Sequence, residues 1–292
     1  MSMRISLHLS IVLTAALAVT TACGEKAADS REYTLQGQVL SVTADHKEAT
    51  IKHEEIKGFM PAMTMPYKVR DANELESLVP GDLINGKLIV ESNDAYLKDV
   101  KKVGQAPLEK APDEPAARSG FELLKDGEPV PPTKFVDQDG KKRDLKSFEG
   151  KALVLTFIYT RCPMPTFCPM MDRNFVALQD RIKADPNLNV HLVTVSFDPA
   201  TDTPPVLKKH GQKLGFDPRF WTFLTGDRDE IDQFAARFGV SVGRAMNDQR
   251  EITHNLRTAI IDRSGNLVKT YTGNEWTPAE VMADIKILVG VD

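Results

Sequence analysis

The sequence predicts two folded units, a small five-stranded β-barrel followed by an α/β domain built on a mainly parallel sheet. Three observations predict this order. Short segments rich in β-forming residues occupy 33–103, a proline-containing stretch with few large apolar side chains covers 104–119, and apolar segments alternate with helical patterns from residue 121 onward. Consecutive short strands favour a closed barrel because closure leaves no unpaired edge, whereas alternating strands and helices are typical of a covered parallel sheet.

The composition of the 292 residues is that of a globular protein, with 41% hydrophobic and 27% charged side chains. The formal net charge is −4, and the sequence contains no long basic run. Both features argue against a nucleic acid as partner, because nucleic-acid-binding proteins concentrate positive charge on the contacting surface.

The N-terminus indicates export. Arg4 gives a positive start, an apolar run covers 11–21, and Cys23 follows small residues, which together predict a signal peptide over residues 1–23. The letters TTACG around Cys23 resemble a bacterial lipobox, although Thr20 stands where that pattern prefers leucine, so cleavage without lipidation is the alternative. We expect the chain at the periplasmic face of the cell envelope, attached to the membrane through lipidated Cys23 alone, in a compartment that permits disulfides.

Residues 24–31 are polar and predict a tether, and the barrel is assigned to residues 32–104. The strands expected in it cover 33–42, 49–53, 63–69, 83–90 and 95–100, with a helical turn within 71–82. Residues 105–120 contain three prolines and predict a semi-extended linker.

The α/β domain is assigned to residues 121–292. It is expected to contain a hairpin at 135–136 and 142–145, strands at 152–158, 189–197 and 220–224, a second hairpin at 258–262 and 267–271, and helices beginning near 169, 203, 227 and 277. The sheet is expected to be mainly parallel and covered on both faces, and the β-β-α that closes the series after β-α-β is typical of a thioredoxin-like fold.

Two of the three cysteines, Cys162 and Cys168, lie in the loop that joins strand 152–158 to the following helix. Two thiols so placed can close a disulfide, act as a redox pair or bind a soft metal, and Cu(I) accepts two or three such ligands. We expect the helix N-terminus to lower the pKa of Cys168. His254, in the polar run 248–255, is the expected third ligand, because that loop lies beside the cysteine loop in a thioredoxin-like fold.

A second group of soft donors lies in the barrel. Met63 and Met65 are two residues apart on a predicted strand, so their thioethers share one face, and Met60 precedes them. His53 ends the preceding strand, and we expect it to meet the methionines across the barrel. Thioethers prefer Cu(I) and cannot be lost to disulfide formation, which suits an exported metal carrier. The alternative is a core face lined with methionine.

Residues 121–292 resemble the Sco/SenC family of thioredoxin-like copper proteins. The matching pieces are FIYTRCP and CP around the two cysteines, VSFDPATDTP at 195–204, and the isolated His254 before TAIIDRSG. The resemblance implies that Cys162, Cys168 and His254 bind copper. The bound ion is expected to be Cu(I), with Cu(II) as the alternative.

The same resemblance implies that Asp198 lies beside the metal without binding it. It also implies a role in assembling the dinuclear copper centre of cytochrome c oxidase, or in serving another respiratory oxidase, as copper donor or as thiol reductant. A thioredoxin-like reductant is a further partner that the resemblance allows. The family usually has three residues between its cysteines and this chain has five, which places Met164 in the loop as a further soft donor.

Residues 33–103 are similar to the periplasmic CusF-like copper-binding domain, whose motif is a histidine followed about ten residues later by Met-x-Met. The similarity implies that His53, Met63 and Met65 bind copper. The tryptophan that covers the metal in that family falls at Met60 here, so Met60 is expected to replace it, as a fourth ligand.

These patterns together predict a copper metallochaperone in which the barrel binds Cu(I) and passes it to the more tightly binding thiolates. One alternative is a thiol-disulfide oxidoreductase that uses Cys162 and Cys168 as a redox pair; others are copper buffering or resistance, and a structural disulfide. The absence of proline from 250–257 counts against the oxidoreductase, since such enzymes place a cis-proline beside their disulfide.

Overall fold

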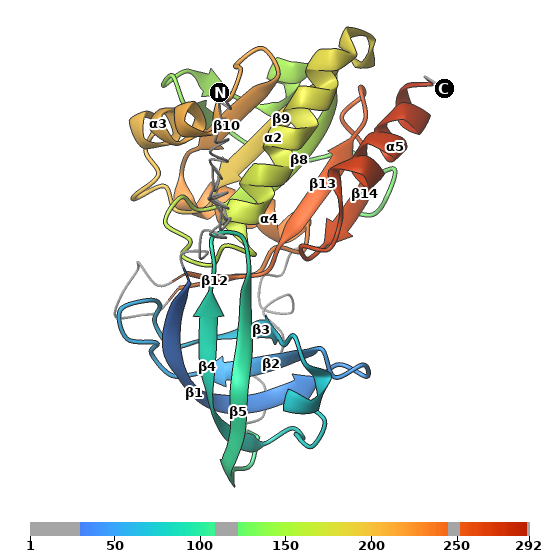
Figure 1. Ribbon diagram of the computed structural model, residues 1–292. Coiled ribbons are helices and arrows are strands. Elements are labelled where there is room, and N and C mark those ends of the chain that lie inside the picture. The colour runs from blue at the N-terminus through green and yellow to red at the C-terminus, as the bar shows by residue number, and fades with distance from the viewer. Residues whose placement is uncertain (1–29, 109–121, 245–251, 291–292) are drawn as a thin grey trace, which may run out of the picture.

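The computed structural model describes residues 30–108, 122–244 and 252–290. The predicted signal peptide with Cys23, most of the tether and most of the linker lie outside these ranges. Within them, the chain forms a five-stranded sheet and, above it in Figure 1, a seven-stranded sheet with helices. Among the described residues, none of the helices combines the length and the hydropathy that a membrane span requires.

The N-terminal sheet has the strand order β3-β2-β1-β4-β5, and every neighbouring pair is antiparallel. Its elements are β1 (Arg31–Val42), β2 (Glu48–His53), β3 (Met63–Lys68), the short 3-10 helix η1 (Ala72–Glu74), β4 (Asp82–Val90) and β5 (Ala95–Gln105). All five predicted strands are present. The two outer strands meet through the Val69–Leu97 bridge, so the strands curl as a barrel does while the hydrogen-bond ladder stays open at that seam.

The second sheet has the strand order β14-β13-β8-β9-β10-β6-β7. Its domain contains β6 (Phe135–Asp137), β7 (Lys142–Arg143), η2 (Leu145–Phe148), β8 (Ala152–Ile158), α2 (Cys168–Ala184), η3 (Pro186–Leu188), β9 (Val190–Ser196), α3 (Pro204–Leu214), β10 (Trp221–Thr225), α4 (Arg228–Arg237), β11 (Val242–Arg244), β12 (Ile252–His254), β13 (Arg257–Ile261), β14 (Leu267–Thr272) and α5 (Pro278–Val289). β8, β9 and β10 are parallel and wholly buried, and the flanking strands are antiparallel. The predicted thioredoxin-like fold is confirmed.

Side-chain caps start two of the helices where the sequence predicts them. The carboxylate of Asp227 accepts hydrogen bonds from the backbone of Asp229 and Glu230 at the start of α4. Thr277 and Glu280 form a reciprocal capping box at the start of α5. Each cap satisfies backbone N–H groups that a helix leaves without partners, which fixes the point at which the helix begins.

The region before β13 differs from the expected loop. Residues Ile252–His254 form β12, which pairs with β11 so that His254 lies opposite Val242. Ile252 is buried and anchors the short strand. Three residues are too few for an alternating pattern to stand out in a polar run, so the pairing was not visible in the sequence.

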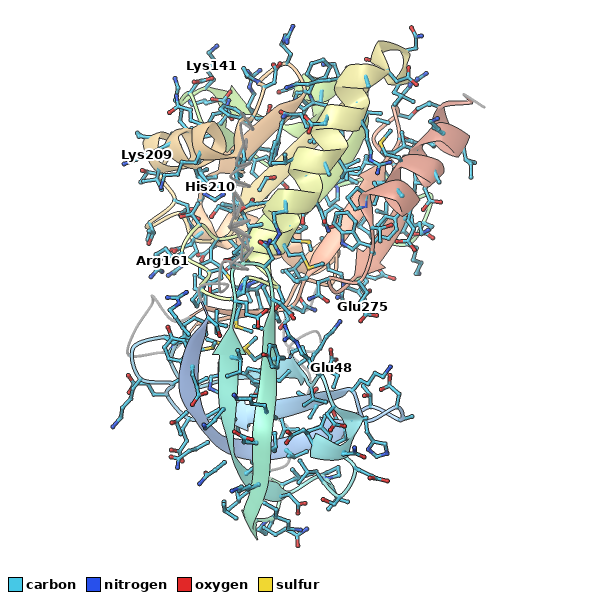
Figure 2. All side chains as sticks on the ribbon, in the orientation of Figure 1. Glu48, Lys141, Arg161, Lys209, His210 and Glu275 are labelled. Atoms are coloured by element: carbon cyan, nitrogen blue, oxygen red, sulfur yellow. The ribbon has the colours of Figure 1, made fainter. Side chains whose placement is uncertain are left out.

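The two domains are in contact through the cysteine loop and α2. Met164 lies among the buried side chains of the barrel. Arg173 Nη2 of α2 donates to the carbonyl of Asn93 in the β4–β5 turn at 3.5 Å, and Lys68 Nζ lies 2.9 Å from Glu275 Oε1. In Figure 2, Glu275 lies at the edge of the α/β domain that faces the barrel. These contacts hold the barrel against the α/β domain.

Candidate metal centres

The structure brings Cys162, Cys168 and His254 together from three separate elements. Cys162 lies in the loop after β8, Cys168 is the first residue of α2, and His254 is the last of β12. Their ligand atoms all lie within 4.8 Å of one another, and His254 Nε2 is 3.5 Å from Cys168 Sγ. Both cysteines are free thiols, so the structure contains no disulfide in this loop. Two sulfurs and one imidazole nitrogen at this spacing can hold one soft metal ion.

His254 presents one defined nitrogen to the thiols. Its Nδ1 lies 2.9 Å from the carbonyl oxygen of Asn255, and a carbonyl can only accept, so Nδ1 carries the proton. The rings of Tyr159 and Phe197 lie 5.5 and 4.6 Å from the imidazole and hold its plane. Nε2 is therefore left with its lone pair directed at the thiols, which is the form that binds a metal.

The two thiols have different acidities. The pKa of Cys162 is well below its usual value, mainly because its thiolate accepts a hydrogen bond from the Cys168 thiol. The pKa of Cys168 is raised, mainly because burial disfavours the charged form and also because Cys162 is close by. The expectation that the helix N-terminus lowers the pKa of Cys168 was wrong, since desolvation outweighs the helix dipole at a sulfur that is almost fully buried.

Asp198 lies beside this site and binds Arg161 rather than the thiols. Its Oδ2 accepts hydrogen bonds from Arg161 Nε at 2.9 Å and from Nη2 at 2.7 Å. Its backbone N–H donates to Ser196 Oγ at 3.1 Å. Figure 2 places Arg161 at the level where the α/β domain meets the barrel. The carboxylate thus fixes the arginine that follows β8, directly before Cys162.

The barrel residues form a second group. His53 at the end of β2 is paired directly with Met63 at the start of β3, and Met65 is paired with Ile51. His53 and Met65 are buried on the inner face, and Met63 is half-buried. The expectation that His53 meets the methionines across the barrel was wrong, because β2 and β3 are neighbours and the residues share one face of a single ladder.

His53 carries a buried nitrogen without a protein partner. Nδ1 lies 2.7 Å from the carbonyl oxygen of Glu54, whereas Nε2 is buried and has no hydrogen-bond partner. Burial lowers the pKa of His53, which keeps the ring neutral. A buried, neutral imidazole with a free lone pair costs folding free energy unless something binds it, and a soft metal beside two thioethers fits.

Met60 stands at the position where the CusF-like resemblance would place a tryptophan that covers the metal. It is buried in a tight turn, bridged to Ile56, and the hydroxyl of Tyr67 donates to its sulfur at 3.9 Å. The neighbouring Phe59 is stacked on Tyr33 with ring centroids 4.5 Å apart. Met60 thus presents its thioether to the inner face, and the Phe59 ring packs against another strand.

A cavity of about 630 Å³ opens to both groups of donors. Its wall includes Met60, Met63 and Met65 from the barrel and Cys162, Met164 and His254 from the α/β domain. Sequence reasoning missed that the two groups share a cavity, although the two extra residues between the cysteines were a signal that this loop reaches beyond its own domain. One cavity therefore reaches part of each candidate site, whereas His53 and Cys168 do not line it.

Comparison with known proteins divides the chain into the same two parts as the fold, because a different family model matches each domain. Residues 125–290 match the family model described as SCO1/SenC, and residues 32–102 match that described as copper binding periplasmic protein CusF. The SCO1 protein homolog of Bacillus subtilis (strain 168) is 34% identical over 161 residues, which is 54% of this chain and 81% of that protein. The human mitochondrial SCO1 homolog is 26% identical over 195 residues, which is 65% of this chain and 61% of that protein.

A solved structure also resembles this chain. That of a SCO1/SenC family lipoprotein from Bacillus anthracis str. Ames is 32% identical, with a TM-score of 0.51, and covers 57% of this chain and 99% of its own. The CusF match and the clustered sulfur and imidazole donors identify copper as the metal. The chain belongs to the SCO1/SenC family and carries a CusF-like domain ahead of the segment that defines that family.

Proposed function

We propose that this protein is a copper metallochaperone of the cell envelope, which binds Cu(I) and delivers it to a membrane respiratory oxidase. The observation that carries the proposal is the cluster of Cys162, Cys168 and His254, with ligand atoms within 4.8 Å. Two thiolates and one neutral imidazole satisfy Cu(I) without a further ligand, and Cu(II) is also compatible with this donor set.

In this proposal the barrel collects Cu(I) through His53, Met63 and Met65, with Met60 as a fourth donor. Thioether sulfur carries no proton to lose and does not form disulfides, so this site works in an oxidising compartment. The ion then moves to the cysteine site. Transfer is downhill because thiolates bind Cu(I) more tightly than thioethers, and the two groups open to the same cavity.

The recipient we propose is the cytochrome c oxidase subunit that carries the dinuclear copper centre, or another respiratory oxidase. Membership of the SCO1/SenC family supports this choice. The periplasmic CusF match and the lipoprotein from B. anthracis support an envelope location, with lipidated Cys23 as the anchor. Asp198 is proposed to act through Arg161, without touching copper.

The test is the Cu(I) stoichiometry of the reduced chain under anaerobic conditions, measured against a colorimetric chelator. We expect two equivalents for the native chain and one for the Cys162→Ser/Cys168→Ser variant. One equivalent in both proteins would confine copper to the barrel. The cysteines would then be better explained as the redox pair of a thiol-disulfide oxidoreductase, which a disulfide-exchange assay would detect.

A further inference from the structure

Met164 belongs to the cysteine loop by sequence and to the barrel by packing. It lies between Cys162 and Cys168, yet its side chain is 4% exposed and is buried in the barrel cluster that contains Met60 and Met65. The flanking Cys162 and Phe167 contact the buried clusters of both domains. Met164 is therefore the point at which the α/β domain enters the core of the other domain.

The loop is held so that Met164 faces the barrel. The backbone N–H of Phe167 donates to the Met164 carbonyl at 3.0 Å and closes a turn. Arg173 donates to the Pro165 carbonyl at 2.9 Å, and Asn274 donates to the Thr166 carbonyl at 2.7 Å. These bonds fix the backbone on the side of the α/β domain and leave the thioether on the side of the barrel.

The sulfur atom of Met164 thus joins a wall that already contains soft donors. The cavity of about 630 Å³ is lined by Met164 together with Met63, Met65 and Cys162. The Cys162 sulfur lies 4.0 Å from the backbone carbonyl oxygen of Met164, and both residues line the cavity. An aliphatic side chain would fill the same space, but only methionine adds a donor for Cu(I).

We propose that Met164 is a copper ligand shared between the two sites, supplied by one domain to complete the thioether set of the other. This inference rests on the proposed function. Cu(I) bound by His53, Met63, Met65 and Met164 moves by ligand exchange: the copper–imidazole and copper–thioether bonds break, copper–thiolate bonds to Cys162 and Cys168 form, and copper stays in the +1 state. Each thiol that is protonated at the start releases its proton to water.

The test uses the full chain with Cys162→Ser and Cys168→Ser, so that only the thioether site takes Cu(I) from a competing chelator. Adding Met164→Leu, which conserves volume, is expected to weaken Cu(I) binding about tenfold and to remove one sulfur from the copper X-ray absorption spectrum. Met282→Leu is the matched control, because Met282 is a buried methionine on α5 that does not line this cavity. Equal melting temperatures for the two leucine variants verify the fold.

A second measurement follows the transfer in the chain with native cysteines. Met164→Leu is expected to slow the appearance of the copper–thiolate absorption after Cu(I) is added, while Met282→Leu leaves its rate unchanged. If Met164→Leu alters neither affinity, sulfur count nor rate, Met164 is a packing residue and the inference is overturned, with both copper sites intact. If the serine variant binds no copper at all, the barrel site itself fails and Met164 fails with it.

Discussion

His254 and Cys168 face each other with Nε2 and Sγ 3.5 Å apart, while Nδ1 of the same ring is held by the carbonyl of the next residue. His53 in the barrel is held in the same way. Its Nδ1 lies 2.7 Å from the carbonyl oxygen of Glu54, and its Nε2 has no hydrogen-bond partner. A fixed tautomer means that neither ring has to turn or exchange a proton before it binds a metal. Both candidate sites are thus preorganised through the backbone that follows each histidine.

Replacement of His254 by alanine is expected to weaken Cu(I) binding at the cysteine site by at least about tenfold, because it removes one of three donors. Disulfide exchange by the two thiols should continue, since it needs no imidazole ligand. Chelator competition and an exchange assay measure the two properties separately. His46→Asn, in the β1–β2 turn, is the control. Unchanged copper affinity in His254→Ala would remove this residue from the ligand set.

Gly37→Ala is expected to damage the barrel site from a distance. Gly37 is paired with His53, and a Cβ there would lie 2.7 Å from Ile51 Cγ2 and 2.9 Å from His53 Cα. Strand β2 would have to move, which costs about 1–3 kcal/mol of unfolding free energy and misplaces the imidazole. Gly86→Ala in β4 has room and serves as control. Equal copper affinity and stability in both variants would contradict this account.

Asp198→Asn tests whether the carboxylate acts through Arg161. The copper stoichiometry should not change, because Asp198 is outside the group of possible ligand atoms among the described residues. The unfolding free energy should fall by about 1–2 kcal/mol, since a buried carboxylate and a guanidinium that is 30% exposed lose their ion pair. Urea unfolding and copper titration measure both. Loss of a copper equivalent would make Asp198 a ligand instead.

The lowered pKa of His191 predicts that the unfolding free energy decreases in acid. Burial, as the main cause, lowers the pKa of His191 to about 4, and Nε2 is paired with Thr222 Oγ1 at 2.8 Å. Between about pH 6.5 and 4 the unfolded chain binds a proton that the folded chain does not. The unfolding free energy therefore falls with decreasing pH, by at most about 1.4 kcal/mol per pH unit.

His191→Gln should remove this contribution and flatten the curve, because glutamine does not titrate and can still reach Thr222. The measurement is urea unfolding of both proteins at pH 7, 5.5 and 4.5. The informative quantity is the difference between the two profiles, since other groups titrate equally in both. Profiles that stay parallel would mean that His191 does not bind its proton differently in the folded and unfolded states.

Local sequence signals predicted much of the fold. The apolar runs of β8 and β9 and the capping box at Thr277 each encode their own element, so no knowledge of distant residues was needed. The strand β12 was not predicted, because its pairing with β11 is a tertiary contact and its three residues show no pattern of their own. Short strands depend on their partners more than on propensity.

The candidate sites were predictable to a different degree. Residue chemistry pointed to Cys162, Cys168 and His254, and the structure brings them together. The acidity of Cys168 could not be predicted, because it depends on burial, which spacing does not reveal. The position of Met164 was also hidden, since a loop sequence does not say which domain its side chain enters.

The cavity between the two domains has a kinetic consequence for its cargo. A metal ion held there would have the barrel on one side and the cysteine loop on the other, so both domains would restrict the approach of a bulky competitor. Exchange should therefore slow as the chelator becomes larger, even when chelators have equal affinity.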